Sequence, residues 1–283
     1  MSNNLSNEKR AQMLMCLVEG MSLRATNRVC GVAFNTALSF VPMLGKACSE
    51  YQDRTLRNLT CERLELDEQH GFYRCRQKNL VQGRNDGGDV WSWLALDSET
   101  KLVVSYFCGD RSISSAFLFL QDIRQRVANE PTIVTDGLAA YVAAVENSFG
   151  SGVDFAQLVK VFGPSGALTP TGRYAPPKLT TLKRNVISGH VEEGEISTSY
   201  VERLNLTVRM GNRRCTRLTN AHSKTLENHV HMMGIFFMFY NFCRIHQSLR
   251  ITPAMAAGVT DHVWEASDVV ALLAESDRVS DAA

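Results

Sequence analysis

The stretch PTIVTDGLAAYVAAVENSF, residues 131–149, decides the fold class. Its first part, TIVT, is rich in β-branched residues and predicts a short buried strand, which ends at Asp136 and turns at Gly137. The second part, GLAAYVAAVENSF, is predicted to form the helix that follows. A buried strand that leads directly into a helix is typical of sheets covered by helices.

A two-residue period dominates the sequence on both sides of this unit. In CERLELDEQHGF, residues 61–72, Leu64 and Leu66 share one face of a predicted strand, whereas Glu65 and Asp67 share the other. Three further strands are predicted at 89–96, 101–108 and 155–163, with helices at 114–127 and beyond residue 195. Together with the strand at 132–135, this order predicts an α/β fold with a mixed five-stranded sheet and flanking helices.

Two segments depart from this pattern in composition. Residues 163–195 are rich in Gly, Pro and Lys and have weak periodicity, which predicts an insertion within a domain that spans residues 61–250. Residues 251–283 carry one basic and six acidic side chains, and we expect them to form a C-terminal helical tail.

The first sixty residues predict a small helical domain. A helix is expected over residues 8–19, ended by Gly20, and Ser22 is placed to cap the next helix. A turn at Gly31 then leads into a third helix, so the order is that of a helix-turn-helix, although other three-helix bundles share it. Pro42 predicts that this third helix is short or restarts there. The candidate base-reading residues near its start are Asn35, Thr36 and Ser39.

Charge is distributed unevenly along the chain. The formal net charge is only +1, but residues 161–250 contain 12 Lys and Arg against 5 Asp and Glu. Such a region could neutralise phosphates or form a solvated basic surface. The candidate phosphate contacts are Arg209, Arg213, Arg214 and Arg217.

Cysteine usage and hydropathy bear on the compartment. The eight cysteines are scattered without a CxxC pair, the first ten residues are polar, and no apolar run approaches the ~18 residues of a membrane helix. These features predict a soluble cytoplasmic protein with reduced thiols and no membrane association.

The stretch ISTSYVERLNLTVR, residues 196–209, places the carboxylate of Glu202 beside the apolar face of a predicted helix. At 3.6 residues per turn, Val201, Leu204 and Val208 form one stripe, and Glu202 lies on the adjoining stripe with Asn205 and Arg209. A carboxylate at the edge of a core needs a cation, a donor or a metal. Glu202 is therefore predicted either to pair with Arg203 or Arg209, or to bind a metal.

The predicted topology offers two partners for a metal site. Asp67 lies on the first strand and Asp136 at the end of the fourth, so neighbouring parallel strands could bring them to one edge beside Glu202. Three clustered carboxylates repel one another unless they share cations, and Mg²⁺ suits oxygen ligands of this kind. We therefore predict metal ligation by Asp67, Asp136 and Glu202, with two Mg²⁺ ions expected and Mn²⁺ as a substitute. Glu65, Glu68 and Asp89 compete with Asp67 for its role.

Several motifs in order resemble the DDE transposases of the insertion sequence 1 type. They are ELDEQHGF, WSWLALDSETKLV, TDGLAAY, STSYVERLNLTVRM, RLTNAHSK, YNFCRIHQSLR and TPAMAAGVTDHVW, of which TDGxxxY and YVERxNxxxR are the most specific. The resemblance spans nearly the whole chain. It implies an RNase H-like catalytic domain with Asp67, Asp136 and Glu202 as catalytic carboxylates, and it implies that Asn205 and Arg209 contact DNA or orient Glu202.

The resemblance implies cut-and-join chemistry on double-stranded DNA. Phosphoryl transfer would free a 3′-hydroxyl at an element end and then join it to target DNA. Because two ends must be joined, we expect a homodimer or a larger assembly. Two alternatives remain: a DNA-binding regulator that retains the RNase H-like domain for docking or dimerisation, and an RNase H-like nuclease without strand transfer.

Overall fold

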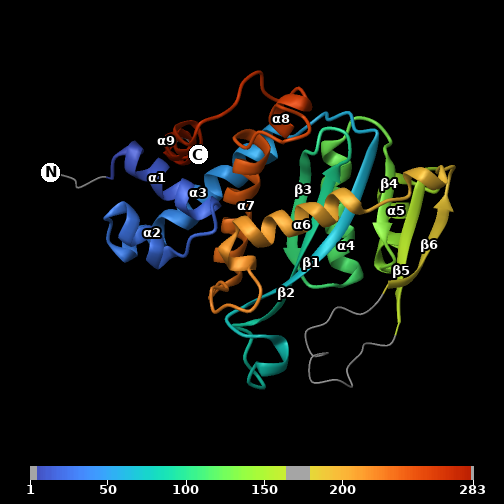
Figure 1. Cartoon of the computed structure of the whole chain (residues 1–283), viewed down its shortest axis with the longest axis horizontal. Coiled ribbons are helices and arrows are strands. Elements are labelled where there is room, and N and C mark those ends of the chain that lie inside the picture. Colours follow the sequence, from blue (N-terminus) through green and yellow to red (C-terminus); the bar gives the residue numbers. More distant parts are fainter. Residues whose placement is uncertain (1–4, 164–178, 282–283) are drawn as a thin grey trace.

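The computed structural model describes residues 5–163 and 179–281 of the chain. Its centre is a mixed six-stranded sheet with the strand order β3-β2-β1-β4-β5-β6 (Figure 1). β1 pairs in parallel with β4, and β4 with β5, while the remaining neighbours are antiparallel. The strands are β1 (Arg63–Tyr73), β2 (Gly88–Asp97), β3 (Val103–Gly109), β4 (Thr132–Asp136), β5 (Phe155–Phe162) and β6 (Leu179–Ser188).

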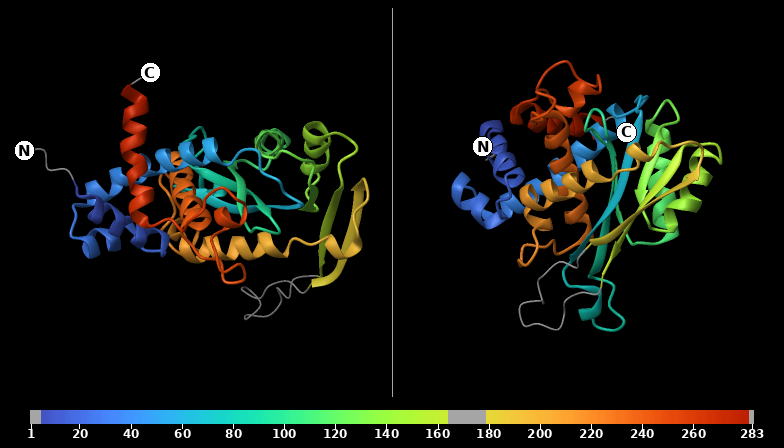
Figure 2. Two further views of the ribbon diagram at one scale, coloured as in Figure 1. Left: turned by 90° about the horizontal axis from the view of Figure 1, so that it is seen from above. Right: turned by 45° about the vertical axis from the view of Figure 1, so that its right-hand side comes forward.

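Helices cover both faces of this sheet (Figure 2). Leu64 and Leu66 of β1 belong to the core that contains α4 and α5, whereas Leu94 and Leu96 of β2 pack with α6 and α7 on the other face. The predicted α/β fold with flanking helices is therefore confirmed. These helices are α4 (Ile113–Arg126), α5 (Ala140–Phe149), α6 (Ser199–Gly211) and α7 (Leu226–Phe242), with short 3-10 turns η1 (Gln77–Asn79), η3 (Glu193–Glu195) and η4 (Arg213–Cys215).

The predicted count of five strands is wrong, because β6 lies within the segment that was expected to be an insertion. β6 pairs with β5 at the edge of the sheet, and its residues are exposed along almost its whole length. A strand that is exposed on both faces lacks the alternation of apolar and polar residues by which strands are predicted. The remainder of the expected insertion, residues 164–178, lies outside the described residues.

The N-terminal residues form three helices, α1 (Asn7–Val18), α2 (Leu23–Cys30) and α3 (Phe34–Thr55). The predicted caps are present, since the hydroxyl of Ser22 accepts the Ala25 N–H and Gly31 adopts a left-handed conformation after α2. The expectation of a short or restarted third helix is wrong, because α3 continues for 22 residues with Pro42 inside it. Pro42 removes the helical partner of the Leu38 carbonyl, but Leu38 is exposed, so water can satisfy that carbonyl.

The N-terminal helices join the rest of the molecule through α3. α3 packs along α7, and α1 and α3 both contact the C-terminal helix α9 (Ala266–Asp281), which follows the short α8 (Pro253–Ala256). One continuous apolar core runs from α1 through the sheet to α9. The domain boundaries near residues 60 and 250 stay predictions.

In the described part of the chain, no single helix is long and apolar enough to cross a membrane. α2 and α3 meet this criterion only when taken together, and they are bent by 113° relative to each other.

The crossing of α3 and α7 gives a prediction about stability. A Cβ atom added at Gly45 would lie 2.4 Å from the Cβ of His231, so Gly45→Ala must push the two helices apart. We expect the free energy of unfolding to fall by about 2 kcal/mol, measured by denaturant titration. Gly152→Ala is the control, because no atom lies within 4 Å of its Cβ position. Equal effects of the two substitutions would contradict this account of the crossing.

Candidate active site

Asp67 and Asp136 lie next to each other at the point where two parallel strands separate. The register of β1 and β4 ends with Leu66 opposite Thr135, so the two aspartates are the next residues along their strands. Because side chains alternate along a strand, both aspartates lie on the sheet face that α6 covers. Carboxylate oxygens of Asp67, Glu68 and Asp136 lie within 4.8 Å of one another. The predicted convergence of the two aspartates is therefore present.

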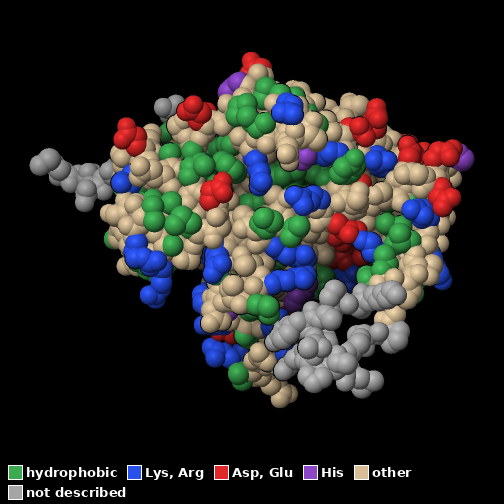
Figure 3. All heavy atoms as spheres, in the orientation of Figure 1, with side chains coloured by type: hydrophobic (Ala, Val, Ile, Leu, Met, Phe, Trp, Pro, Cys, Tyr) green, Lys and Arg blue, Asp and Glu red, His purple; other side chains and the backbone are tan. Residues whose placement is uncertain are grey.

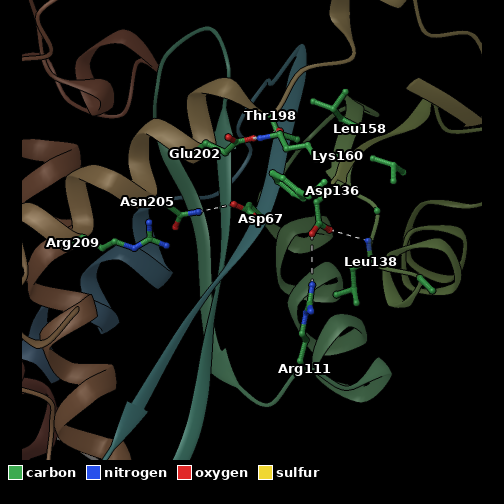
Figure 4. Close-up of a pocket in the computed structure, with 14 residues that line it drawn as sticks. Asp67, Arg111, Asp136, Leu138, Leu158, Lys160, Thr198, Glu202, Asn205 and Arg209 are labelled. Carbon is green, nitrogen blue, oxygen red and sulfur yellow. Dashed lines mark hydrogen bonds and ion pairs between the residues drawn. The ribbon is translucent and has the colours of Figure 1, made fainter. Parts of the chain in front are cut away.

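A cavity of about 650 Å³ opens between this edge of the sheet and α6 (Figure 4). Asp67 and Asp136 line it from the strands. Glu202, Asn205 and Arg209 line it from successive turns of α6, as their shared stripe predicted. The other lining side chains with a charge are Arg111, which follows β3, and Lys160 on β5.

Glu202 faces the cavity but is bonded away from the two aspartates. Its Oε1 accepts hydrogen bonds from the Lys160 ammonium group and, at 2.5 Å, from the Thr198 hydroxyl. The Glu202 side chain is 41 % exposed, and Glu68 takes its place in the close group of carboxylates. The cation beside Glu202 is thus Lys160, whereas the sequence offered Arg203 or Arg209 as partners.

Asp67 is held by two hydrogen bonds, but its burial opposes ionisation. Its Oδ1 accepts the Glu68 N–H at 2.9 Å, and its Oδ2 accepts the Asn205 side-chain amide at 2.6 Å. Burial raises the pKa of Asp67 to about 7, and the charges of Asp136 and Glu202 act in the same direction. A carboxyl group of this kind gains strongly from a nearby cation.

Arg111 balances the charge on the opposite side of the aspartates. Its guanidinium lies 2.5 Å from Oε1 of Glu68 and 3.7 Å from Oδ2 of Asp136, and it stacks over the ring of Trp91. Burial nevertheless raises the pKa of Glu68 to about 7, with the charge of Asp136 as the next cause. Burial also raises the pKa of Asp136, against the lowering effect of its hydrogen bond from the Leu138 N–H.

Glu65 has a structural function that the sequence did not reveal. Its Oε2 accepts the N–H groups of Tyr200 at 2.8 Å and Val201 at 3.0 Å, in the first turn of α6. The N-cap residue Thr198 directs its hydroxyl to Glu202, and among the described residues the Ser197 hydroxyl accepts only the Ser199 N–H, at 3.2 Å. Glu65 is fully buried and lies on the same strand face as Asp67. It therefore fixes the start of α6 on the sheet two residues from a candidate ligand.

The donor atoms fit a hard divalent cation. Asp67 and Asp136, with Glu68 beside them, offer carboxylate oxygens at short mutual distances, and such oxygens are the preferred ligands of Mg²⁺ and Mn²⁺. Glu202 could join them after its release from Lys160. The raised pKa values of Asp67 and Glu68 follow from carboxylates buried without enough positive charge, as a cation site requires.

The other candidate DNA-binding residues lie on separate surfaces. Arg214 and Arg217 line a second cavity beyond the C-terminal end of α6, and Arg213 lines an apolar groove between η4 and α2. Figure 3 shows basic side chains gathered beside the acidic group at the centre of that view. Asn35 and Ser39 are exposed near the start of α3, with Thr36 half-buried between them. Their contact with DNA stays a prediction.

No protein-family model matches the chain, and no curated protein matches it. Among solved structures, the chain is similar to a piggyBac transposase determined by cryo-electron microscopy as a synaptic complex with hairpin DNA. The identity is 13 %, the TM-score is 0.42, and the match covers 95 % of this chain and 71 % of that chain. The function of this chain is therefore inferred from its own residues and their geometry.

The pKa of Asp67 gives a prediction about stability and pH. A carboxyl group with a pKa of about 7 in the folded state and near 3.8 when unfolded stabilises the fold fully only below pH 4. That contribution is lost as the pH rises through 7. In the absence of metal, Asp67→Asn should therefore stabilise the fold more at pH 8 than at pH 4, by up to about 4 kcal/mol in the free energy of unfolding.

Thermal unfolding in a chelator at both pH values measures this difference. Added Mg²⁺ at pH 8 should stabilise the unsubstituted protein and leave the Asp67→Asn protein unaffected. Equal effects of the substitution at pH 4 and pH 8 would contradict the raised pKa.

Proposed function

We propose that the chain is a DDE-type transposase that cuts and joins double-stranded DNA with divalent metal ions. The observation that carries this proposal is the placement of Asp67, Asp136 and Glu202 around one cavity. These three residues come from two adjacent parallel strands and a helix that crosses them. They also belong to the ordered motifs that resemble transposases of the insertion sequence 1 type, and the mixed sheet supports an RNase H-like catalytic domain.

The metal would be held by Asp67 and Asp136, with Glu202 completing the site. Bound Mg²⁺ would polarise the phosphodiester and favour formation of the attacking nucleophile. Asp67 can serve this role only when ionised, so Mg²⁺ affinity should rise as the pH increases through about 7.

The basic side chains of the cavity would bind and orient the DNA. Arg209 lies two turns beyond Glu202, and its Nε is buried without a hydrogen-bond partner in the described residues. Lys160 is bonded to Glu202, and a DNA phosphate could take the place of that carboxylate. Both cations would stabilise the negative charge that builds up during phosphoryl transfer.

Sequence recognition is proposed for the N-terminal helices. α2 and α3 are joined by a short turn at an angle of 113°, which is within the range of helix-turn-helix pairs. Asn35 and Ser39 are exposed near the start of α3, where such proteins contact base edges. The basic segment 161–250 would supply phosphate contacts, and we propose a homodimer or larger assembly in the cytoplasm because two DNA ends must be joined.

Cleavage of DNA with and without the carboxylates tests the proposal. In Mg²⁺, Asp67→Asn, Asp136→Asn and Glu202→Gln should each reduce nicking of a duplex that carries the element ends by at least about 100-fold, because each removes a metal ligand. Binding to the same duplex, measured by fluorescence anisotropy in a chelator, should change less than about threefold.

Glu146→Gln is the matched control, because Glu146 is exposed on α5 and outside the cavity. Undiminished nicking by the Asp136→Asn protein would contradict the proposal. Nicking without joining of the freed 3′-hydroxyl would indicate a nuclease, and DNA binding without any nicking would indicate a regulator.

A further inference from the structure

A second cavity, of about 740 Å³, lies beyond the catalytic one. It is enclosed by the end of β1, by η4 and by the segment that follows η4. Its lining includes three arginines and two histidines but no carboxylate. In Figure 1 these segments lie at the lower end of β1 and β2, beside the C-terminal end of α6. A cavity with this lining favours an anionic ligand.

One wall of this cavity is aromatic. The rings of Phe72 and His222 lie 4.6 Å apart between centroids and are tilted by 40°. The guanidinium of Arg76 lies 5.5 Å from the centre of the Phe72 ring. Nε2 of His222 contacts the Arg74 carbonyl at 2.9 Å, which fixes the imidazole beside Phe72. Flat side chains held in this way can stack on a planar ligand.

The basic wall has unused hydrogen-bonding capacity. Arg214 donates one hydrogen bond to the Ser223 hydroxyl at 3.2 Å, while its other terminal nitrogen is buried without a partner. Arg217 is exposed. Among the described residues, no ion pair with a carboxylate is found for Arg76, Arg214 or Arg217, although seven other arginines form such pairs. These three arginines are therefore free to contact an added anion.

β1 contributes lining residues to both cavities. β1 carries Asp67 in the first cavity and Phe72 in the second, and five residues of a strand span about 17 Å. On the other side, α6 and η4 carry Arg209 and then Arg214. Burial lowers the pKa of Arg209, and the positive charge of Arg217 adds to this effect, which indicates that the two basic groups are close. A DNA strand that leaves the catalytic cavity past Arg209 would approach Arg217 and the second cavity.

We propose that this second cavity binds an unpaired nucleotide of the DNA strand that extends from the catalytic site. The base would stack on Phe72 and His222, while the adjoining phosphates would contact Arg214 and Arg217. A paired base in a duplex is stacked on both faces and cannot reach such a wall, so the ligand is single-stranded. This inference rests on the proposed function, because it takes DNA as the substrate.

Fluorescence anisotropy in a chelator tests the site without catalysis. The probes are a blunt duplex and the same duplex with a three-nucleotide single-stranded extension. The unsubstituted protein should bind the extended duplex about tenfold more tightly, since stacking of one base contributes about 1–3 kcal/mol. Phe72→Leu, which keeps apolar volume but removes the aromatic ring, should abolish this preference and leave blunt-duplex affinity unchanged.

Two further variants keep the result interpretable. Phe72→Trp retains an aromatic face and should retain the preference for the extended duplex. If Phe72 only filled a tight space in the structure, the larger Trp side chain would disturb the site and the preference would be lost. Arg217→Ala, at an exposed position, should weaken binding of the extended duplex and reduce its dependence on salt.

Free deoxynucleoside monophosphate serves as a competitor that separates a strand site from a mononucleotide site. Competition at micromolar concentration, without any preference for the extended duplex, would overturn the proposal in favour of a mononucleotide site. Equal affinity of the Phe72→Leu and unsubstituted proteins for the extended duplex would also overturn it. This experiment measures binding and not cleavage. Failure to prefer the extended duplex would therefore not contradict the proposed cleavage function, and failure to nick DNA would not contradict a measured preference.

Discussion

The site depends on the hydrogen bonds between the carboxylate of Glu65 and the first turn of α6. The N–H groups at the start of a helix have no partner within it and carry partial positive charge, so a carboxylate is a favourable acceptor there. Glu65 supplies that acceptor from inside the sheet, bonding to Tyr200 and Val201. Burial raises the pKa of Glu65, and the two backbone hydrogen bonds counteract this effect. The helix start is thereby fixed against β1, and Glu202 follows one residue later.

With α6 in place, several carboxylates lie close together around the cavity, and their mutual repulsion is unfavourable for folding. Asp67, Glu68 and Asp136 are held close together, and Glu202 faces them across the cavity. Arg111 and Lys160 offset part of this charge from the two sides. Burial is the main cause of the raised pKa of Asp67 and of Glu68, and the charge of Asp136 acts in the same direction. Because this arrangement is unfavourable without added cations, it would favour the binding of a divalent cation.

The sequence predicts the placement of side chains correctly where their periodicity follows from the local geometry of a strand or helix. Alternation along β1 separated Leu64 and Leu66 from Glu65 and Asp67, and the structure places these pairs on opposite faces of the sheet. The helical stripe of Glu202, Asn205 and Arg209 was likewise sufficient to place all three on one cavity. Contacts between segments that are distant in the sequence cannot be predicted from these local patterns.

Lys160 beside Glu202 and Arg111 beside Glu68 join residues 42 and 43 positions apart, and no local pattern indicates such pairs. The sequence presents Glu65 only as a competitor of Asp67, because its hydrogen bonds depend on where α6 begins in space. β6 does not show the alternation by which strands are predicted because it is exposed on both faces, and α3 continues through Pro42, where the residue that loses its helical partner, Leu38, is exposed.

Glu65 fixes the start of α6 and so positions Glu202 at the proposed metal site. Hydrogen exchange of the Tyr200 and Val201 amides, followed together with Mn²⁺ affinity, tests it in Glu65→Leu and Glu65→Gln proteins. Glu65→Gln keeps an acceptor oxygen and should retain both protection and affinity. Glu65→Leu removes the acceptor, so these amides should exchange at least about tenfold faster and Mn²⁺ affinity should fall, since one such hydrogen bond contributes about 1–3 kcal/mol. Unchanged protection of both amides in the Glu65→Leu protein would contradict the claim.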